Sequence, residues 1–126
     1  MAIEIEYRKC IQCKEHKLLS EFNGKWKVCK VCDKVRRKEK VQKCRNFILD
    51  YLQNHPCVDC GQSDPTVLIF DHLRDKRKSL SYFIRKGYSV KVLIEEIKKC
   101  EVRCANCHAR KTAREQGWYK YDAGQD

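Results

Sequence analysis

The sequence predicts a small α+β protein that is stabilised by zinc. Three observations lead to this prediction: the chain has 126 residues, its mean hydropathy is −0.73, and it contains ten cysteines. A chain this short and polar buries only a modest core and usually needs a further source of stability. Eight of the cysteines form four Cys-x-x-Cys pairs, and this spacing is typical of thiolate zinc sites.

Zinc is favoured over disulfide bonds because the N-terminus carries no apolar signal segment and disulfides belong mainly to secreted proteins. We therefore expect an intracellular protein that is not secreted. No stretch of the sequence reaches the length of a transmembrane helix. No segment combines a wide apolar face with a basic one outside the regions expected to form the core, so we expect no membrane partner.

The chain is strongly basic, with 28 Lys and Arg residues against 17 Asp and Glu residues, a net charge of +11 and a pI near 9.2. Such an excess of positive charge indicates a polyanionic partner, most simply nucleic acid. The alternative is a basic surface that is merely well solvated, and charge alone fits both interpretations.

Residues 1–34 are predicted to form an N-terminal zinc module. One Cys-x-x-Cys pair ends at Cys13, and the next begins after fifteen intervening residues at Cys29. Each pair places two sulfurs on one side of a tight turn, which a tetrahedral ion can bridge. Trp26, after the turn signal Asn23-Gly24, is expected to cover this small core. The predicted ligands are Cys10, Cys13, Cys29 and Cys32.

Residues 35–54 are predicted to be a connecting helix, because the chain from Asp33 to about Asn54 contains neither Pro nor Gly and Pro56 follows it. Asp33 is a candidate N-cap. The second half of this helix carries an apolar stripe that includes Cys44, whose thiol is expected to be buried and free. The first half is basic, and it either lies along a phosphate backbone or is a solvated face. Its candidate phosphate contacts are Arg36, Arg37 and Lys38.

Residues 55–126 are expected to form a second domain, which holds the other two Cys-x-x-Cys pairs. Cys44 and Cys100 then remain outside both zinc sites, although Cys100 is close enough in sequence to replace Cys104 in an alternative arrangement. The predicted ligands of the second zinc ion are Cys57, Cys60, Cys104 and Cys107.

The second domain is predicted to alternate short strands and helices. The run Thr66–Phe70 has the composition of a buried strand. A short structured piece near residues 82–84 precedes a helix from Val90 to about Cys100, and a last helix starts near Cys107. The helix that follows Ser89, its expected N-cap, should bury the residues that recur at helical spacing. These are Val90, Leu93, Ile94 and Ile97.

A carboxylate and two histidines lie close to the second zinc site in the sequence. Asp71 and His72 directly follow the predicted strand, and His108 directly follows Cys107. Such a set can hold one hard divalent ion and leave one imidazole free as a general base.

The second domain resembles the HNH endonucleases, most closely the small zinc-stapled members common in phages. The resemblance covers about residues 55–115 and rests on three motifs. It implies a ββα-metal fold, in which a hairpin is followed by a helix, and DNA as the substrate of a metal-dependent phosphodiester hydrolase. The motifs are Cys57-x-x-Cys60-Gly61, Phe70-Asp71-His72 and the run from Cys100 to Thr112.

By this resemblance His72 is the general base, while Asp71 and His108 bind a catalytic Mg²⁺ or Mn²⁺ ion beside the two structural zinc ions. The positive side chains expected to contact the scissile strand are Arg103, Arg110 and Lys111. The family's middle Asn is missing here, and the neighbourhood in which it usually lies has the sequence Lys98-Lys99-Cys100.

Two other classes of protein compete with this interpretation. A non-catalytic zinc-finger protein that binds DNA or RNA fits the composition and the zinc sites equally well, and only Asp71, His72 and His108 discriminate against it. A thiol-redox protein is disfavoured, because that chemistry uses one Cys-x-x-Cys motif in a βαβ context. The sequence predicts no oligomeric state.

Overall fold

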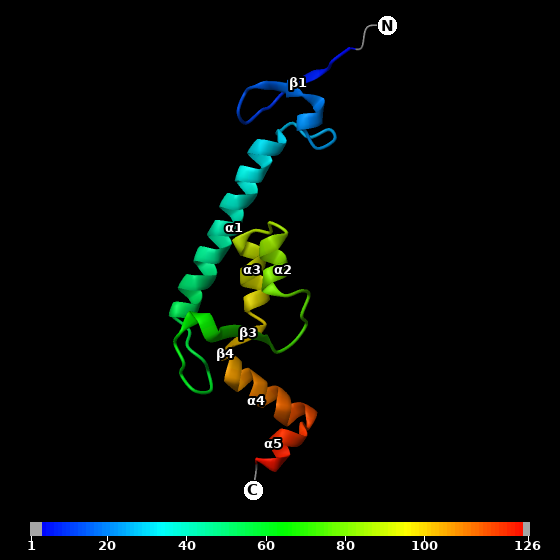
Figure 1. The fold of residues 1–126 in the computed structure, drawn as a ribbon. Coiled ribbons are helices and arrows are strands. Elements are labelled where there is room, and N and C mark those ends of the chain that lie inside the picture. Colours follow the sequence, from blue (N-terminus) through cyan, green and yellow to red (C-terminus); the bar gives the residue numbers. More distant parts are fainter. Residues whose placement is uncertain (1–3, 125–126) are drawn as a thin grey trace. The chain divides into compact units, whose positions relative to one another are not determined.

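The computed structural model describes residues 4–124, which form two small antiparallel sheets and five α-helices (Figure 1). The predicted small α+β class is therefore confirmed. The chain divides into two compact units, Met1–Gln42 and Lys43–Asp126. The sequence placed boundaries after residues 34 and 54, whereas the division between the units falls within one helix. None of the helices in residues 4–124 combines the length and the apolar character needed to cross a bilayer.

The first unit is built around a short hairpin. Strand β1 (Tyr7–Lys9) pairs antiparallel with β2 (His16–Leu18), and the 3-10 helix η1 (Leu19–Glu21) follows. Trp26 is 57% exposed, so the expectation that it covers this core is wrong. The buried residues of this unit are Cys10, Phe22, Val28 and Cys29.

Helix α1 (Lys30–Gln53) starts directly after Cys29, earlier than predicted. Asp33 is therefore not its N-cap: it lies inside the first turn, its N–H donates to the Cys29 carbonyl, and its carboxylate pairs with Arg37 at 3.4 Å. Residues 30–42 of α1 belong to the first unit and residues 43–53 to the second. The helix ends before Pro56, as its sequence predicts.

The second unit is organised around the antiparallel pair β3 (Leu68–His72) and β4 (Cys100–Cys104), with Asp71 opposite Glu101 and His72 opposite Cys100. The 3-10 helix η2 (Pro65–Val67) leads into β3. Because β3 extends to residue 72, Asp71 and His72 belong to the strand itself. Side chains alternate between the faces of a strand, so these two neighbours occupy opposite sides of it.

Helix α4 (Ala105–Gln116) follows β4 without a loop. It begins two residues earlier than predicted, because the Cys104 sulfur accepts the Cys107 N–H at 3.4 Å and acts as the N-cap. It ends at Gly117, whose positive φ of 64° suits a residue without a Cβ. Helix α5 (Tyr119–Ala123) comes next.

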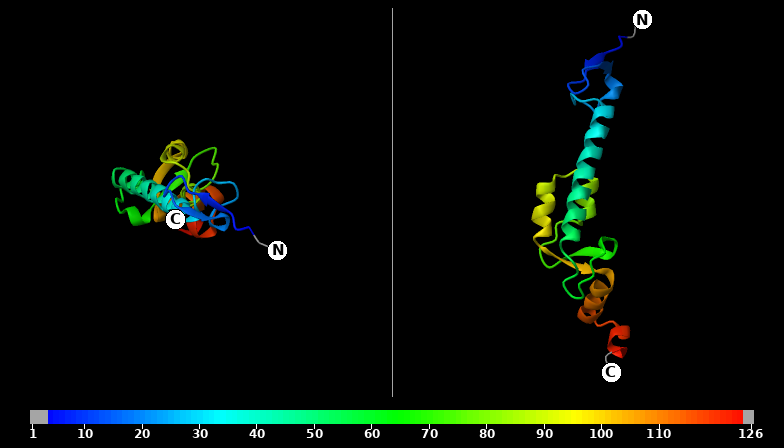
Figure 2. Two further views of the ribbon diagram at one scale, coloured as in Figure 1. Left: turned by 90° about the horizontal axis from the view of Figure 1, so that it is seen from above. Right: turned by 90° about the vertical axis from the view of Figure 1, so that its left-hand side faces the viewer.

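Helices α2 (Leu80–Arg85) and α3 (Val90–Ile97) lie between the two strands in sequence and beside the C-terminal part of α1 in space (Figures 1 and 2). Helix α3 ends at Ile97, earlier than the predicted end near Cys100, and Cys100 is the first residue of β4. Ser89 is its N-cap, but its side chain makes no capping bond. Ile94 is 37% exposed, whereas Glu96 is only 2% exposed. The predicted buried face of α3 was therefore wrong at Ile94.

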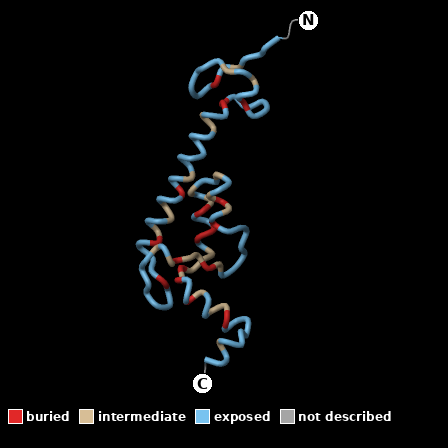
Figure 3. The backbone as a smooth tube through the Cα atoms, viewed as in Figure 1, coloured by how far each residue is buried: buried red, intermediate tan, exposed pale blue. Residues whose placement is uncertain are grey.

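Two clusters of buried residues hold the second unit together (Figure 3). Cys44 belongs to the second cluster, and its thiol donates to the Tyr88 carbonyl at 3.3 Å, so its prediction as a buried residue is confirmed. The first cluster contains Leu52, Cys57, Leu68, Val102, Cys104 and Cys107. The second contains Cys44, Leu80, Phe83, Leu93 and Ile97.

Candidate functional site

The first unit brings four cysteine sulfurs together, all within 4.8 Å of one another. Bonds of ~2.3 Å from a tetrahedral zinc ion to its sulfurs imply a separation of ~3.8 Å between two sulfurs. The Cys13 and Cys29 sulfurs are 4.0 Å apart. This cluster could hold a metal ion such as zinc, and it consists of the predicted residues Cys10, Cys13, Cys29 and Cys32.

Hydrogen bonds to Cys10 favour its thiolate form, which is the form that binds metal. The backbone N–H groups of Gln12, Cys13 and Cys29 each donate to the Cys10 sulfur at 3.4 Å. Burial raises the pKa of Cys10, but these bonds outweigh that effect and lower it to about 6. The Lys17 ammonium donates to the Cys29 sulfur at 3.3 Å.

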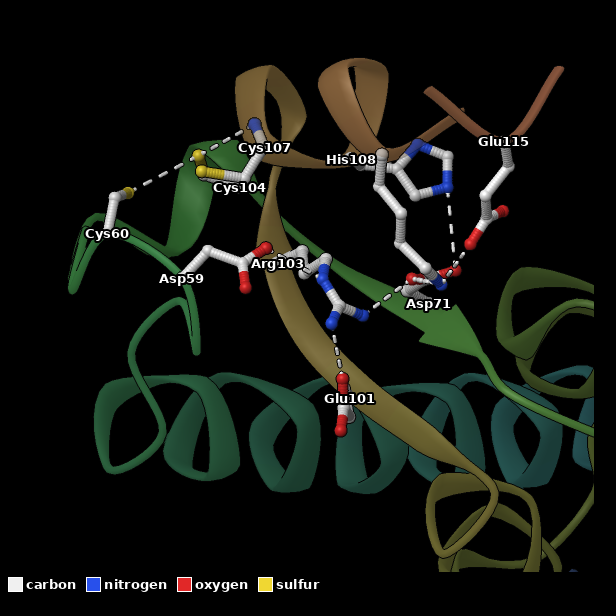
Figure 4. A network of polar contacts seen from close by, with 10 residues as sticks. Asp59, Cys60, Asp71, Glu101, Arg103, Cys104, Cys107, His108 and Glu115 are labelled. Carbon is white, nitrogen blue, oxygen red and sulfur yellow. Dashed lines mark hydrogen bonds and ion pairs between the residues drawn. The ribbon is translucent and has the colours of Figure 1, made fainter. Parts of the chain in front are cut away.

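The second unit contains an equivalent cluster, again with all four sulfurs within 4.8 Å. The Cys60 and Cys104 sulfurs are 3.7 Å apart (Figure 4), which also fits tetrahedral zinc. Gly61, with a φ of 77°, permits the turn after Cys60. The predicted ligands Cys57, Cys60, Cys104 and Cys107 are the ones brought together. This cluster joins the loop after α1 to the end of β4 and the start of α4.

Cys100 lies outside the second cluster, so the alternative in which it replaces Cys104 is not the arrangement found. Its thiol donates to the Glu96 backbone carbonyl at 3.4 Å. Burial, followed by the nearby carboxylates of Glu96 and Asp71, raises the pKa of this thiol to about 11. This thiol is therefore protonated at neutral pH.

Asp71 is the centre of a cluster of charged residues between β3 and α4 (Figure 4). Its Oδ2 atom accepts hydrogen bonds from Arg103 and Lys111, both at 2.7 Å. Its Oδ1 atom is 3.6 Å from His108 Nε2. Burial alone would raise the pKa of Asp71, but Lys111, Arg103 and His108 lower it below its ordinary value. The Asp71 side chain is therefore a carboxylate at neutral pH.

Asp71 and His108 are the two predicted ligands of a divalent ion, and the fold brings them together. With metal–ligand distances of ~2.0–2.1 Å, two ligands of one Mg²⁺ lie roughly 3–4 Å apart, and the 3.6 Å separation of the two side chains falls in this range. In residues 4–124, groups of three or more convergent ligand residues occur only at the two cysteine clusters. An ion at Asp71 would therefore need further ligands from water or substrate.

Arg103 is tied to three carboxylates rather than extended toward solvent. It bonds Asp59 at 2.8 Å and Asp71 at 2.7 Å, and it forms an ion pair with Glu101. Its side chain is 11% exposed. The expected contact of Arg103 with the scissile strand thus competes with three existing partners, and its evident role is to position Asp71.

Of the other predicted phosphate contacts in this unit, Arg110 is exposed, whereas Lys111 is partly buried and bonded to Asp71. Arg110 and Lys111 line a hollow of about 280 Å³ beside the second cysteine cluster, together with Arg114, which the sequence reasoning missed. Arg110 and Arg114 are exposed. In the first unit, the three predicted phosphate contacts on α1 are also exposed, and one of them, Arg37, pairs with Asp33. The exposed residues are Arg36, Arg37 and Lys38.

His72 does not join Asp71 and His108. It lies on the opposite side of β3, where its Nε2 is 3.1 Å from Glu96 Oε1, and its side chain is 11% exposed. His72 is therefore a largely buried side chain with a buried partner, although the sequence suggests a free imidazole. Glu96 itself was missed, although it lies three residues after Leu93 and therefore on the same face of α3.

The chain matches no family model, no curated protein and no solved structure. The interpretation of the site therefore depends on the residues and their geometry.

Proposed function

We propose that this chain is a metal-dependent HNH-type endodeoxyribonuclease, in which His72 is the general base and two zinc ions are structural. The observation that carries the proposal is the approach of Asp71 on β3 to His108 on α4. The second unit also has an antiparallel strand pair whose second strand runs directly into a helix, with a cysteine cluster at that junction. This supports the hairpin and helix that the HNH resemblance implies, although α2 and α3 here lie between the two strands in the chain.

Asp71 and His108 would hold the divalent ion, which supplies Lewis-acid stabilisation of the charge that develops on the phosphate in the transition state. His72 would accept a proton from the attacking water. Because His72 and Asp71 face opposite sides of β3, this step requires the water to lie at the end of the strand, where His72 is the last residue. Arg110 and Lys111 add positive charge near the cleaved strand, and the net charge of +11 favours approach of a polyanion.

The decisive experiment is digestion of supercoiled plasmid with and without Mg²⁺ or Mn²⁺. We expect conversion to nicked or linear DNA that requires the divalent ion and stops when EDTA is added. Binding of DNA without cleavage under either ion would contradict the proposal.

One observation favours a second candidate, a non-catalytic zinc-stabilised protein that binds nucleic acid. Arg103 and Lys111 each form an ion pair with Asp71, and a carboxylate with two cationic partners can serve structure alone. The candidates differ in the response to metal. The second predicts salt-dependent DNA binding with no ion-dependent cleavage.

Substitution of Asp71 by Asn should raise the Mn²⁺ concentration needed for half-maximal nicking by at least ~10-fold, because an anionic ligand is lost. His108→Ala should act in the same direction, and excess Mn²⁺ should partly restore both variants. Asp59→Asn is the matched control, since Asp59 also bonds Arg103 but lies 46% exposed in a separate loop. If Asp59→Asn raises the required Mn²⁺ concentration equally, the effect would come from a displaced Arg103 and not from a lost metal ligand.

Neutralising Arg36, Arg37 and Lys38 to Gln should weaken DNA binding at all sequences. Each lost phosphate contact lowers the slope of log K against log salt by ~0.9, so the slope should fall by roughly 2–3. The control neutralises three exposed cations on other elements, Lys9, Lys91 and Lys120. Equal effects of the two triple variants would mean that α1 contributes only net charge.

A further inference from the structure

Glu96 is a buried carboxylate that the proposed reaction has not yet used. Only 2% of it is exposed. Its Oε1 atom accepts the backbone N–H of Arg77 and contacts His72 Nε2, both at 3.1 Å, and its Oε2 atom accepts the Lys99 ammonium at 3.1 Å. Isolated buried charges are costly, so this set of partners identifies a carboxylate that the fold is built to keep charged.

The charge state of Glu96 follows from these contacts. Burial raises the pKa of Glu96, but the Lys99 ammonium and the Arg77 N–H lower it below its ordinary value. An ionised carboxylate has no proton and can only accept hydrogen bonds. His72 must therefore donate at Nε2. Since a neutral imidazole has a single N–H, its Nδ1 atom then carries the free lone pair.

We propose that Glu96 is the positioning residue of His72: it holds the ring through Nε2–H and leaves Nδ1 as the basic nitrogen. The inference rests on the proposed function in one respect, namely that His72 is the general base. A general base must present its lone pair in a fixed direction. A carboxylate bonded to the far nitrogen of the ring fixes both the tautomer and the orientation.

Lys99 extends this support to the loop that follows His72. Its ammonium donates to the Asp75 carbonyl at 2.9 Å as well as to Glu96. Its own backbone carbonyl accepts the Leu73 N–H at 2.8 Å. The Glu96–Lys99 pair therefore connects α3 to both the His72 ring and the loop from residue 73 to residue 77.

The first test is a nitrogen-15 NMR measurement on the wild-type protein at about pH 9, where an ordinary imidazole is neutral. His72 should show a bare Nδ1 and a protonated Nε2 whose hydrogen is protected from exchange with water. A His72 ring that is protonated at Nδ1 would overturn the proposal. This measurement does not depend on cleavage activity.

The second test compares Glu96→Ala with Glu95→Ala. Glu95 provides a matched control, because it pairs with Lys98 at 3.1 Å with the same sequence spacing but is 65% exposed. Glu96→Ala should lower the nicking rate by ~10–10²-fold, leave DNA affinity within about twofold, and give His72 the averaged signals of a freely exchanging imidazole. Glu95→Ala should change none of these.

A folded Glu96→Ala protein with unchanged His72 signals would overturn the proposal. If Glu96→Ala does not fold, Glu96→Gln replaces it, because an amide offers one acceptor oxygen to three donors. The nicking rate of Glu96→Gln should then fall at unchanged DNA affinity, and a wild-type rate would count against Glu96. Expected NMR signals in a protein that never nicks would leave the His72–Glu96 contact in place and reject the nuclease function.

Discussion

Replacing His72 by Ala should lower the rate of plasmid nicking by ~10²–10⁴-fold, the usual contribution of a general base. The rate should be measured at saturating Mg²⁺ or Mn²⁺, with zinc content and DNA affinity determined on the same preparation. Both of these should remain at the wild-type level, because His72 belongs to neither cysteine cluster and lies on the opposite side of β3 from Asp71.

Because His72 contacts Glu96, the His72→Ala protein should also be less stable than the wild type. His72→Ala removes one hydrogen bond to a charged group, and such a bond contributes ~1.5–3 kcal/mol. Glu96 keeps its bonds to Arg77 and Lys99, so the unit should remain folded with a lower melting temperature. His72→Gln is the companion variant, since its amide can donate to Glu96 but cannot act as a base.

The two variants together separate chemistry from structure. Both should be inactive if His72 is the base, and extra Mn²⁺ should rescue neither, in contrast to Asp71→Asn and His108→Ala. A His72→Gln protein that nicks at the wild-type rate would limit His72 to a structural role.

Cys104→Ser should unfold the second unit under conditions in which the wild type is folded. A structural zinc site contributes ~10–16 kcal/mol in small domains, which matches or exceeds the whole ~5–15 kcal/mol stability of a typical domain. Cys104 also belongs to the buried cluster with Leu52, Leu68 and Val102. Loss of zinc therefore opens the core as well as the metal site.

Elemental analysis and circular dichroism check this prediction. Wild-type protein purified without chelator should contain two zinc ions per chain, and Cys104→Ser should contain one and lose helical signal. Cys100→Ser is the matched control, because Cys100 lies at the other end of β4 and outside the cluster. Loss of zinc in Cys100→Ser but not in Cys104→Ser would reverse the ligand assignment.

Much of this arrangement could be predicted because it depends on short-range pattern. Cys-x-x-Cys spacing fixes two sulfurs on one turn, so both cysteine clusters were found from the sequence. The apolar run before Asp71 identified β3, although not its last residues. Cys44 was placed correctly because it follows the helical period of its apolar neighbours.

The features that were missed depend on contacts between distant segments. Glu96 is separated from His72 by 24 positions, and a glutamate in a helix ordinarily faces solvent. Only the partners His72, Arg77 and Lys99 make its burial favourable. The same holds for Arg103, because two of its three carboxylate partners, Asp59 and Asp71, come from distant parts of the chain. The position of Arg103 next to Cys104 in the sequence does not predict these ion pairs.

Because side chains alternate between the two faces of β3, the adjacent residues Asp71 and His72 have separate partners. Asp71 faces α4 and its cations, while His72 faces α3, so a change on one side leaves the other side intact. In the nuclease proposed here, the single substitution His72→Ala should therefore give a protein that binds DNA without cleaving it. Such a variant would be the practical choice for trapping the proposed DNA complex.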